Sequence, residues 1–158
     1  MPLKLNELIE ELRDADRQER IELLIDFAKS LRPLPARLES LKDATHRVEE
    51  CQSPVFLFVE PAGEVLEIHA DAPIEAPTVR GFVSLLVEGL SGGTIEEILT
   101  APDDLVDRAG LVEILGMLRV RGLTGVLRRV KREATKAAIG RAEGAGKAVN
   151  GQADAPSK

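Results

Sequence analysis

The sequence predicts an α+β fold, in which a small antiparallel β-sheet of about three strands packs against N-terminal and C-terminal helices. Two observations carry this prediction. The middle of the chain holds an apolar run over residues 55–59 and an alternating pattern over residues 64–70, both typical of strands. Amphipathic helical patterns precede and follow this region, so helices and strands are segregated along the chain. There is no internal repeat, and we expect a single domain over residues 1–139.

Two helices are expected before the strands. Asn6 is a candidate N-cap for a short first helix. Asp16 and Glu19 have the spacing of a capping box for a second helix. The apolar stripe of this second helix comprises Ile21, Leu24, Ile25, Ala28 and Leu31. Pro33 and Pro35 are expected to end it, because a proline disfavours the helical conformation of the residue before it.

A β-hairpin is expected next, after a loop or short helical turn over residues 36–45. Residues 55–59 are apolar at every position, as in a strand covered on both faces. A turn over residues 60–63 leads into residues 64–70, whose alternate positions are apolar. A third strand is expected over residues 45–50, directly before the single cysteine.

Helices follow the strands to the end of the fold. Pro77 suits the first turn of a helix that is apolar nearly all round, which we expect to be central and buried. Thr94 and Glu97 form a second capping box, for a short helix. The last helix carries an apolar stripe of Leu123, Val126, Leu127, Val130 and Ala134. Residues 140–158 are rich in Gly, Ala and polar residues, and we expect a disordered tail there.

Composition and charge limit the function classes. One cysteine in 158 residues rules out an internal disulfide and a four-thiolate metal site, and favours a reducing compartment. The N-terminus lacks the pattern of a signal peptide and no apolar run is long enough for a membrane span, so we expect a cytoplasmic protein. Residues 1–116 carry 11 basic and 24 acidic side chains, a balance of −13, and residues 117–158 carry 10 and 3, a balance of +7. The acidic body argues against non-specific nucleic-acid binding.

The single cysteine, Cys51, lies in a polar run just ahead of the apolar strand. A cysteine retained for packing usually lies within an apolar stretch, whereas this one is flanked by Glu50 and Gln52. Pro54 cannot donate a hydrogen bond to a strand neighbour, which indicates a loop, an edge or a bulge at this point. Arg47 and His46 are candidates for lowering the thiol pKa, and Glu49 and Glu50 for raising it. Residue chemistry alone leaves both a reactive thiol and a buried inert one open.

Residues 47–57 resemble the signature R-V-x-G-C-Q-S-x-V-W-L of the SufE family, whose members accept sulfur from cysteine desulfurases in iron–sulfur cluster assembly. The segment reads Arg47-Val48-Glu49-Glu50-Cys51-Gln52-Ser53-Pro54-Val55-Phe56-Leu57. Val79-Arg80-Gly81-Phe82 is similar to the family's V-x-G segment, and Arg119-Val120-Arg121-Gly122-Leu123 to its R-x-x-G-L element. The resemblance covers about residues 5–136 and implies a fold of the SufE and IscU type.

The resemblance implies a concrete function. Cys51 would take the outer sulfur of a persulfide on a pyridoxal-phosphate-dependent cysteine desulfurase of the SufS type, stimulate that enzyme, and pass the sulfur to a scaffold complex of the SufBCD type. Gln52, Ser53, Arg80 and Arg119 are candidates for supporting the loop or an anionic persulfide. A surface role for Arg80 stays open, as does a role of Arg119 and Arg121 in orienting the last helix or contacting the desulfurase. The carrier itself would need no metal and no cofactor, and would be a monomer or a weak homodimer.

Two positions depart from the family signature. Glu50 stands where the family has glycine, which removes backbone freedom and places a carboxylate beside the thiol. Phe56 replaces the family's tryptophan and keeps an aromatic side chain at that position.

Three further hypotheses remain open at this point. His46, His69 and Cys51 are candidate ligands of an open zinc site, although their spacing matches no ligand motif. The basic stripe of Arg128, Arg129, Lys131, Arg132 and Lys136 is compatible with a helical adaptor or nucleic-acid-binding protein. The third hypothesis is a regulator that docks on a desulfurase without accepting sulfur, and Glu50 is its motive.

Overall fold

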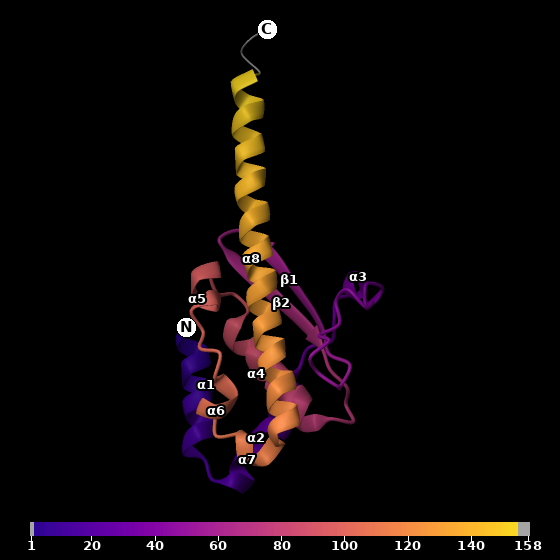
Figure 1. The fold of residues 1–158 in the computed structure, drawn as a ribbon, viewed down its shortest axis with the longest axis vertical. Coiled ribbons are helices and arrows are strands. Elements are labelled where there is room, and N and C mark those ends of the chain that lie inside the picture. Colours follow the sequence, from indigo (N-terminus) through magenta and orange to yellow (C-terminus); the bar gives the residue numbers. More distant parts are fainter. Residues whose placement is uncertain (1, 155–158) are drawn as a thin grey trace.

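The computed structural model describes the backbone of residues 2–154 and the side chains of residues 2–142. The chain folds as α1 (Leu3–Asp14), α2 (Arg17–Ser30), α3 (Ala36–Glu39), β1 (Phe56–Ala62), β2 (Val65–Asp71), α4 (Pro77–Leu90), α5 (Ile95–Leu99), α6 (Leu105–Arg108), α7 (Val112–Leu115) and α8 (Met117–Asp154). Helices thus precede and follow one β-hairpin, which confirms the predicted α+β class (Figure 1).

Helix α4 is the centre of the molecule. It packs against α1 and α2 on one side and against β2 and α8 on the other. Most of its side chains are buried, including Phe82, which is completely so. The predicted central helix is therefore confirmed, and the core around it is aliphatic because the chain has no Trp or Tyr and only four Phe.

The caps predicted at residues 16 and 94 are present and the one at residue 6 is not, and of the capping box predicted at residues 16 and 19 only the Asp16 half forms. Asp16 caps α2, because its carboxylate accepts a hydrogen bond from the Glu19 N–H at 2.9 Å. Thr94 and Glu97 form the predicted capping box of α5. Asn6 does not cap α1, which begins three residues earlier at Leu3, after Pro2. That earlier start buries Leu5 as well as Ile9 and Leu12.

The sheet has two strands rather than about three. Strands β1 and β2 are antiparallel, with Phe58 opposite His69, and the tight turn between them places Gly63 at φ +65°, which glycine adopts without strain. The expected third strand over residues 45–50 is reduced to one bridge, between Arg47 and Phe56. Pairing stops there because the chain turns away after Val48, whose N–H donates to the Val55 carbonyl at 2.9 Å.

Helix α8 lies against β1 and α5, and its last turns project beyond the body of the molecule (Figure 1). The predicted stripe of Leu123, Val126, Leu127, Val130 and Ala134 is buried throughout. The backbone is helical to Asp154, whereas the sequence predicts a disordered tail from residue 140. Residues 155–158 lie outside the described part of the chain, and the boundary at residue 139 stays a prediction.

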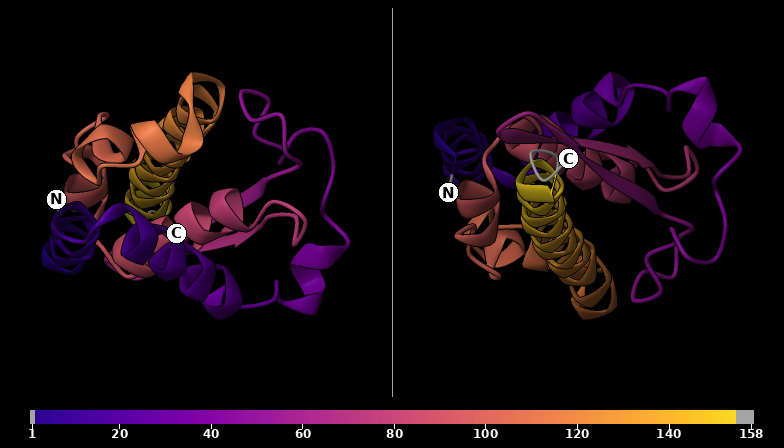
Figure 2. Two further views of the ribbon diagram at one scale, coloured as in Figure 1. Left: turned by 90° about the horizontal axis from the view of Figure 1, so that it is seen from below. Right: turned by 90° about the horizontal axis from the view of Figure 1, so that it is seen from above.

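The hairpin separates two ends of the molecule. Helix α1 lies at one end and the segment that carries α3 at the other, with the sheet between them in every view (Figure 2). The two strands are covered along their outer edges by irregular backbone. On the β2 side, residues 91–93 pair with the strand, and the Gly92 N–H donates to the Leu66 carbonyl at 2.8 Å. On the β1 side, the Leu57 N–H donates to the backbone carbonyl of His46 at 2.9 Å.

Gly81 of α4 allows α2 to approach closely, and this contact yields a first prediction. A Cβ at residue 81 would overlap the Leu24 carbonyl oxygen and lie 2.8 Å from the carbonyl carbon. Alanine in a helix interior normally gains about 1 kcal/mol over glycine, but backbone atoms of α2 cannot move aside as a side chain can. We expect Gly81→Ala to lower the free energy of unfolding in urea by about 2 kcal/mol.

Gly140→Ala in α8 is the matched control, because a Cβ there meets no atom within 4 Å. It should leave the free energy of unfolding unchanged or slightly higher. Equal unfolding midpoints for the two variants would contradict the packing described for Gly81.

Candidate functional site

Cys51 lies in a short loop that leaves and re-enters the fold at a single point. Val48 and Val55 form the neck of this loop and are both completely buried. The Val48 N–H donates to the Val55 carbonyl at 2.9 Å, and the Cys51 N–H donates back to the Val48 carbonyl at 3.3 Å. Residues 49–54 therefore form a closed turn outside the sheet, which agrees with the loop that Pro54 predicted.

The thiol is buried in the hydrophobic core where the loop lies against two glycines of α8. Cys51 is 5% exposed. A Cβ at Gly122 would lie 3.2 Å from the Cys51 Cα and 3.3 Å from its Sγ. A Cβ at Gly125 would overlap the Glu50 Cβ. The helix therefore receives the loop backbone directly, at a distance that glycine permits and a larger residue would not.

The environment of the sulfur combines burial with positive charge. Burial raises the pKa of the Cys51 thiol above its ordinary value, because a thiolate loses its hydration there. The Ser53 N–H, which donates to the sulfur, and the charges of Arg47 and Arg119 lower the same pKa in part. The thiol is protonated at rest, and the groups that would stabilise its anion are already beside it.

The predicted site residues divide into two groups. Ser53 and Arg119 act on Cys51 as described, and Arg119 is held in place by a hydrogen bond to the Thr78 hydroxyl at 3.0 Å. Gln52 is exposed on the surface of the loop. Arg80 is engaged elsewhere, because it donates to the carbonyls of Ala28 and Ala72. It joins α2 to the end of β2, and none of its hydrogen bonds involves the cysteine loop.

The segment before the cysteine loop, which the sequence predicts as a loop or short helical turn, anchors the loop on its N-terminal side. Residues 37–46 cross the outer face of the hairpin. Arg37 forms a bidentate pair with Glu60 at 2.6 and 2.7 Å, and Lys42 pairs with Asp71 at 2.6 Å. His46 stacks on Phe58 with ring centroids 4.6 Å apart. The chain therefore enters the cysteine loop from a fixed position.

The three candidate zinc ligands do not come together in the described part of the chain. His46 contacts Asp43 through Nδ1 at 2.9 Å. His69 Nε2 is buried without a hydrogen bond and lies 3.5 Å from Glu60 and 3.7 Å from Glu67. Within residues 2–142, no group of three His, Cys, Asp or Glu side chains is placed to hold a metal ion.

Much of the basic stripe on α8 is used within the molecule. Arg129 donates to the backbone carbonyls of Arg47 and Thr45, which fixes the chain just before the loop. Lys131 pairs with Asp103 at 2.8 Å and Arg132 with Glu50 at 3.7 Å. Lys136 pairs with Glu133, and Arg128 remains exposed.

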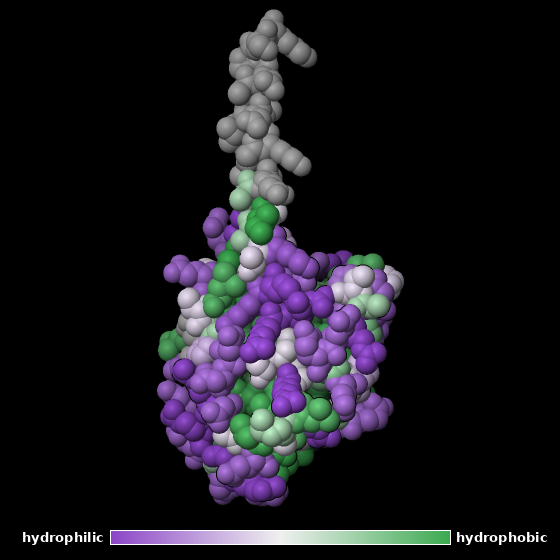
Figure 3. Space-filling model, in the orientation of Figure 1, coloured by the Kyte–Doolittle hydropathy of each residue, from purple (hydrophilic) through white to green (hydrophobic). Residues whose placement is uncertain are grey.

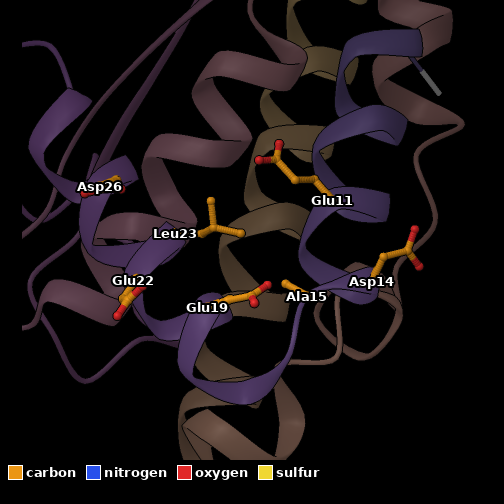
Figure 4. Close-up of a pocket in the computed structure, with 7 residues that line it drawn as sticks. All are labelled: Glu11, Asp14, Ala15, Glu19, Glu22, Leu23 and Asp26. Atoms are coloured by element: carbon orange, nitrogen blue, oxygen red, sulfur yellow. The ribbon is translucent and has the colours of Figure 1, made fainter.

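Two other surface features lie outside the cysteine loop. Apolar side chains gather over α7 and the start of α8 (Figure 3), where Met117 and Leu118 are 61% and 59% exposed. A hollow between α1 and α2 is lined mainly by carboxylates, as Figure 4 shows. Its lining residues are Glu11, Asp14, Ala15, Glu19, Glu22, Leu23 and Asp26. Among the described residues, no helix has the length and apolar character needed to cross a membrane.

Sequence reasoning missed the two glycines that accept the loop. Gly122 was visible as part of the Arg119–Leu123 element, but its contact with a cysteine far earlier in the chain depends on the tertiary fold. Gly125, three residues further on, had no motif around it. Two glycines at helical spacing on one face are a usable signal for close approach by another backbone.

Comparison with known proteins points to one family. Residues 6–134 match the SufE family, described as a Fe-S metabolism associated domain. An uncharacterised SufE-like protein of Mycobacterium tuberculosis (strain H37Rv) is 37% identical over 138 residues, which cover 87% of this chain and 95% of the relative. A SufE-like protein of Synechocystis sp. (strain PCC 6803) is 28% identical over 147 residues, covering 92% and 89% of the two chains.

A plant relative and a solved structure are also similar to this chain. SufE-like protein 1 of Arabidopsis thaliana, chloroplastic/mitochondrial, is 30% identical over 138 residues, which cover 85% of this chain and 35% of that longer protein. The solution structure of a hypothetical protein from Thermus thermophilus has a TM-score of 0.77 and 32% identity, covering 88% of this chain and 98% of that one. With its fold, its cysteine loop and these relatives in agreement, the chain belongs to the SufE family.

Proposed function

We propose that Cys51 accepts sulfur from the persulfide of a pyridoxal-phosphate-dependent cysteine desulfurase. The Cys51 thiolate attacks the outer sulfur of the partner's persulfide, the S–S bond within the partner breaks, and the partner's cysteine leaves as a thiolate. The new S–S bond is on Cys51. The exchange needs no external oxidant or reductant, because one persulfide replaces another.

The burial of Cys51 beside two cations is the observation that carries this proposal. A persulfide is easily reduced or attacked by other thiols, so a carrier benefits from a resting position that excludes solvent. Arg47 and Arg119 favour an anionic sulfur, whether thiolate or persulfide, at this position. The site therefore combines protection at rest with stabilisation of the reacting anion.

The sulfur would then pass to a scaffold on which an iron–sulfur cluster is assembled. A scaffold needs several thiolate or equivalent ligands for iron, and this chain has one cysteine. Its role in Fe–S metabolism is thus that of a carrier, and the pyridoxal phosphate belongs to the desulfurase. Removing sulfur from the desulfurase would also speed that enzyme's turnover.

Two other functions are separated from this one by simple measurements. A regulator that docks without accepting sulfur would still stimulate the desulfurase after Cys51→Ser. A nucleic-acid-binding adaptor would be retained on DNA at low salt and released as the salt rises. Against the adaptor stands the pairing of Lys131, Arg132 and Lys136 with carboxylates of the same chain, which offsets part of the positive charge of α8.

Sulfur transfer to Cys51 is tested by the intact mass of the protein. The wild-type protein and Cys51→Ser are incubated with a cysteine desulfurase, pyridoxal phosphate and free cysteine. We expect the wild type to gain the mass of one sulfur atom, reversibly on reduction, and Cys51→Ser to gain nothing, because Cys51 is the only thiol. A desulfurase that loads a known acceptor but leaves the wild type unmodified would refute sulfur transfer from that partner.

The burial of the thiol makes a second, pH-dependent prediction. Because the pKa of Cys51 is raised, alkylation by iodoacetamide should have a midpoint at higher pH in the folded protein than in the denatured one. The folded state holds the proton more tightly. The corresponding contribution to stability is therefore complete below the pKa of the unfolded thiol and is lost as the pH rises through the folded pKa.

Neutral variants of the nearby cations sharpen this test. Arg119→Gln should move the alkylation midpoint of the folded protein to still higher pH, since the charge of Arg119 lowers the thiol pKa. Arg17→Gln, at an exposed position on α2, is the control and should not move it. A folded midpoint below the denatured one would contradict the geometry of the loop.

A further inference from the structure

One face of α8 receives the whole segment that leads into the cysteine loop. Gly122, Gly125, Arg129 and Arg132 follow one another at spacings of three and four residues, which places them on one side of the helix. Gly122 lies against Cys51, Gly125 against Glu50, and Arg129 binds the carbonyls of residues 45 and 47. Arg132 completes the row through its ion pair with Glu50.

The Glu50 side chain lies directly over Gly125. A Cβ at Gly125 would overlap the Glu50 Cβ and lie 3.0 Å from its Cγ. The stem of Glu50 therefore lies flat on the helix backbone, and its carboxylate extends along α8 to Arg132, at 3.7 Å. The residue that replaces the family's glycine is thus fitted to this helix.

Few other interactions hold the tip of the loop. The neck between Val48 and Val55 is firmly hydrogen-bonded, but it lies at the base. The Cys51 N–H reaches the Val48 carbonyl only at 3.3 Å, and Gln52 and Pro54 are exposed. Within the described part of the chain, Gly122 of α8 lies against the sulfur, and the Glu50 side chain joins the loop tip to α8.

We propose that Glu50 is a positioning residue, which holds the cysteine loop closed on Gly125 and Arg132 of α8 and so sets how often the sulfur is exposed. Both members of the ion pair are about half-exposed, so their attraction is modest and is screened by salt. The closed loop is therefore favoured but opens readily. Opening exposes the sulfur without disturbing the hydrogen-bonded neck.

Only the link between loop opening and sulfur transfer rests on the proposed function. If Cys51 carries sulfur, the opening of the loop precedes each transfer, and Glu50 adjusts the balance between protection and delivery. The hold itself is a property of the folded chain. It is measurable as the accessibility of the Cys51 thiol to a small reagent, with no desulfurase present.

The first experiment compares two Gly→Ala variants of the same helix by the rate of thiol alkylation. In Gly125→Ala the new Cβ displaces Glu50, and we expect alkylation of Cys51 to become at least about fivefold faster. Gly140→Ala has the same chemical change with open space around it, and its rate should equal that of the wild type. Unfolding in urea, measured in parallel, verifies that both variants are folded.

A double-mutant cycle separates the hold from a general loosening of the helix. Glu50→Gly removes the Cβ that meets Gly125 and should also accelerate alkylation. Combined with it, Gly125→Ala should add little, because its contact partner has gone. The proposal is overturned if Gly125→Ala accelerates alkylation by the same factor in both backgrounds, or if its rate equals that of folded Gly140→Ala.

The ion pair is tested separately, with variants at exposed positions that retain the fold. Glu50→Gln and Arg132→Gln should each accelerate alkylation, and raising the salt from about 0.05 M to about 0.5 M should accelerate the wild type but not these variants. Glu49→Gln makes the same charge change at the exposed neighbouring residue and is the control. The full pH profile distinguishes the two causes of a faster rate. Loop opening raises the rate at every pH, whereas a lower thiol pKa shifts the midpoint.

Sulfur loading then distinguishes failure of this inference from failure of the proposed function. If the protein accepts sulfur but all variants are alkylated at the same rate, the proposed function is supported and the role of Glu50 is refuted. If the protein accepts no sulfur but shows the expected alkylation pattern, the role of Glu50 is supported and the proposed function is refuted. Faster loading of Glu50→Gln than of Glu49→Gln would support both.

Discussion

The contact between the cysteine loop and α8 is the constraint on which the site depends. Cys51 is buried where the loop lies against a helix backbone, and residues 50 and 51 come this close because the helix has glycine at two successive positions of one face. Helix α8 is in turn placed by its buried apolar stripe against β1 and α4. The packing that stabilises the fold therefore also determines the accessibility of the sulfur.

The loop is local, but the parts that frame it come from the whole chain. The segment over residues 37–46 is tied to the outer face of the hairpin by two ion pairs and an aromatic stack, and β1 begins directly after the loop. Arg129 fixes the carbonyls just before the loop. Both ends are thus held while the tip depends on α8. Regions with few anchoring contacts open at the lowest free energy, so motion is expected at the tip, where transfer chemistry would need it.

Burial and positive charge have opposite effects on the sulfur, and a carrier gains from both. Burial favours the protonated thiol and would shield a persulfide from other thiols, while Arg47 and Arg119 favour the anion. The chain differs from the family signature at Glu50, which places a carboxylate next to this site. The structure accommodates that side chain on Gly125 and pairs it with Arg132, away from the sulfur. Helix α8 therefore has space and an opposite charge for the Glu50 side chain.

Local patterns in the sequence determined the α+β class, the central helix α4, the caps at Asp16 and Thr94 and the loop around Cys51. They did so because hydrophobic period, capping residues and proline act over a few neighbouring residues. Tertiary structure decided the rest. It reduced the third strand to one bridge, directed Arg80 to backbone carbonyls, and brought Gly122 and Gly125 against residues 50 and 51. These outcomes depend on contacts between segments distant in the chain, whose distances follow only from how the helices pack.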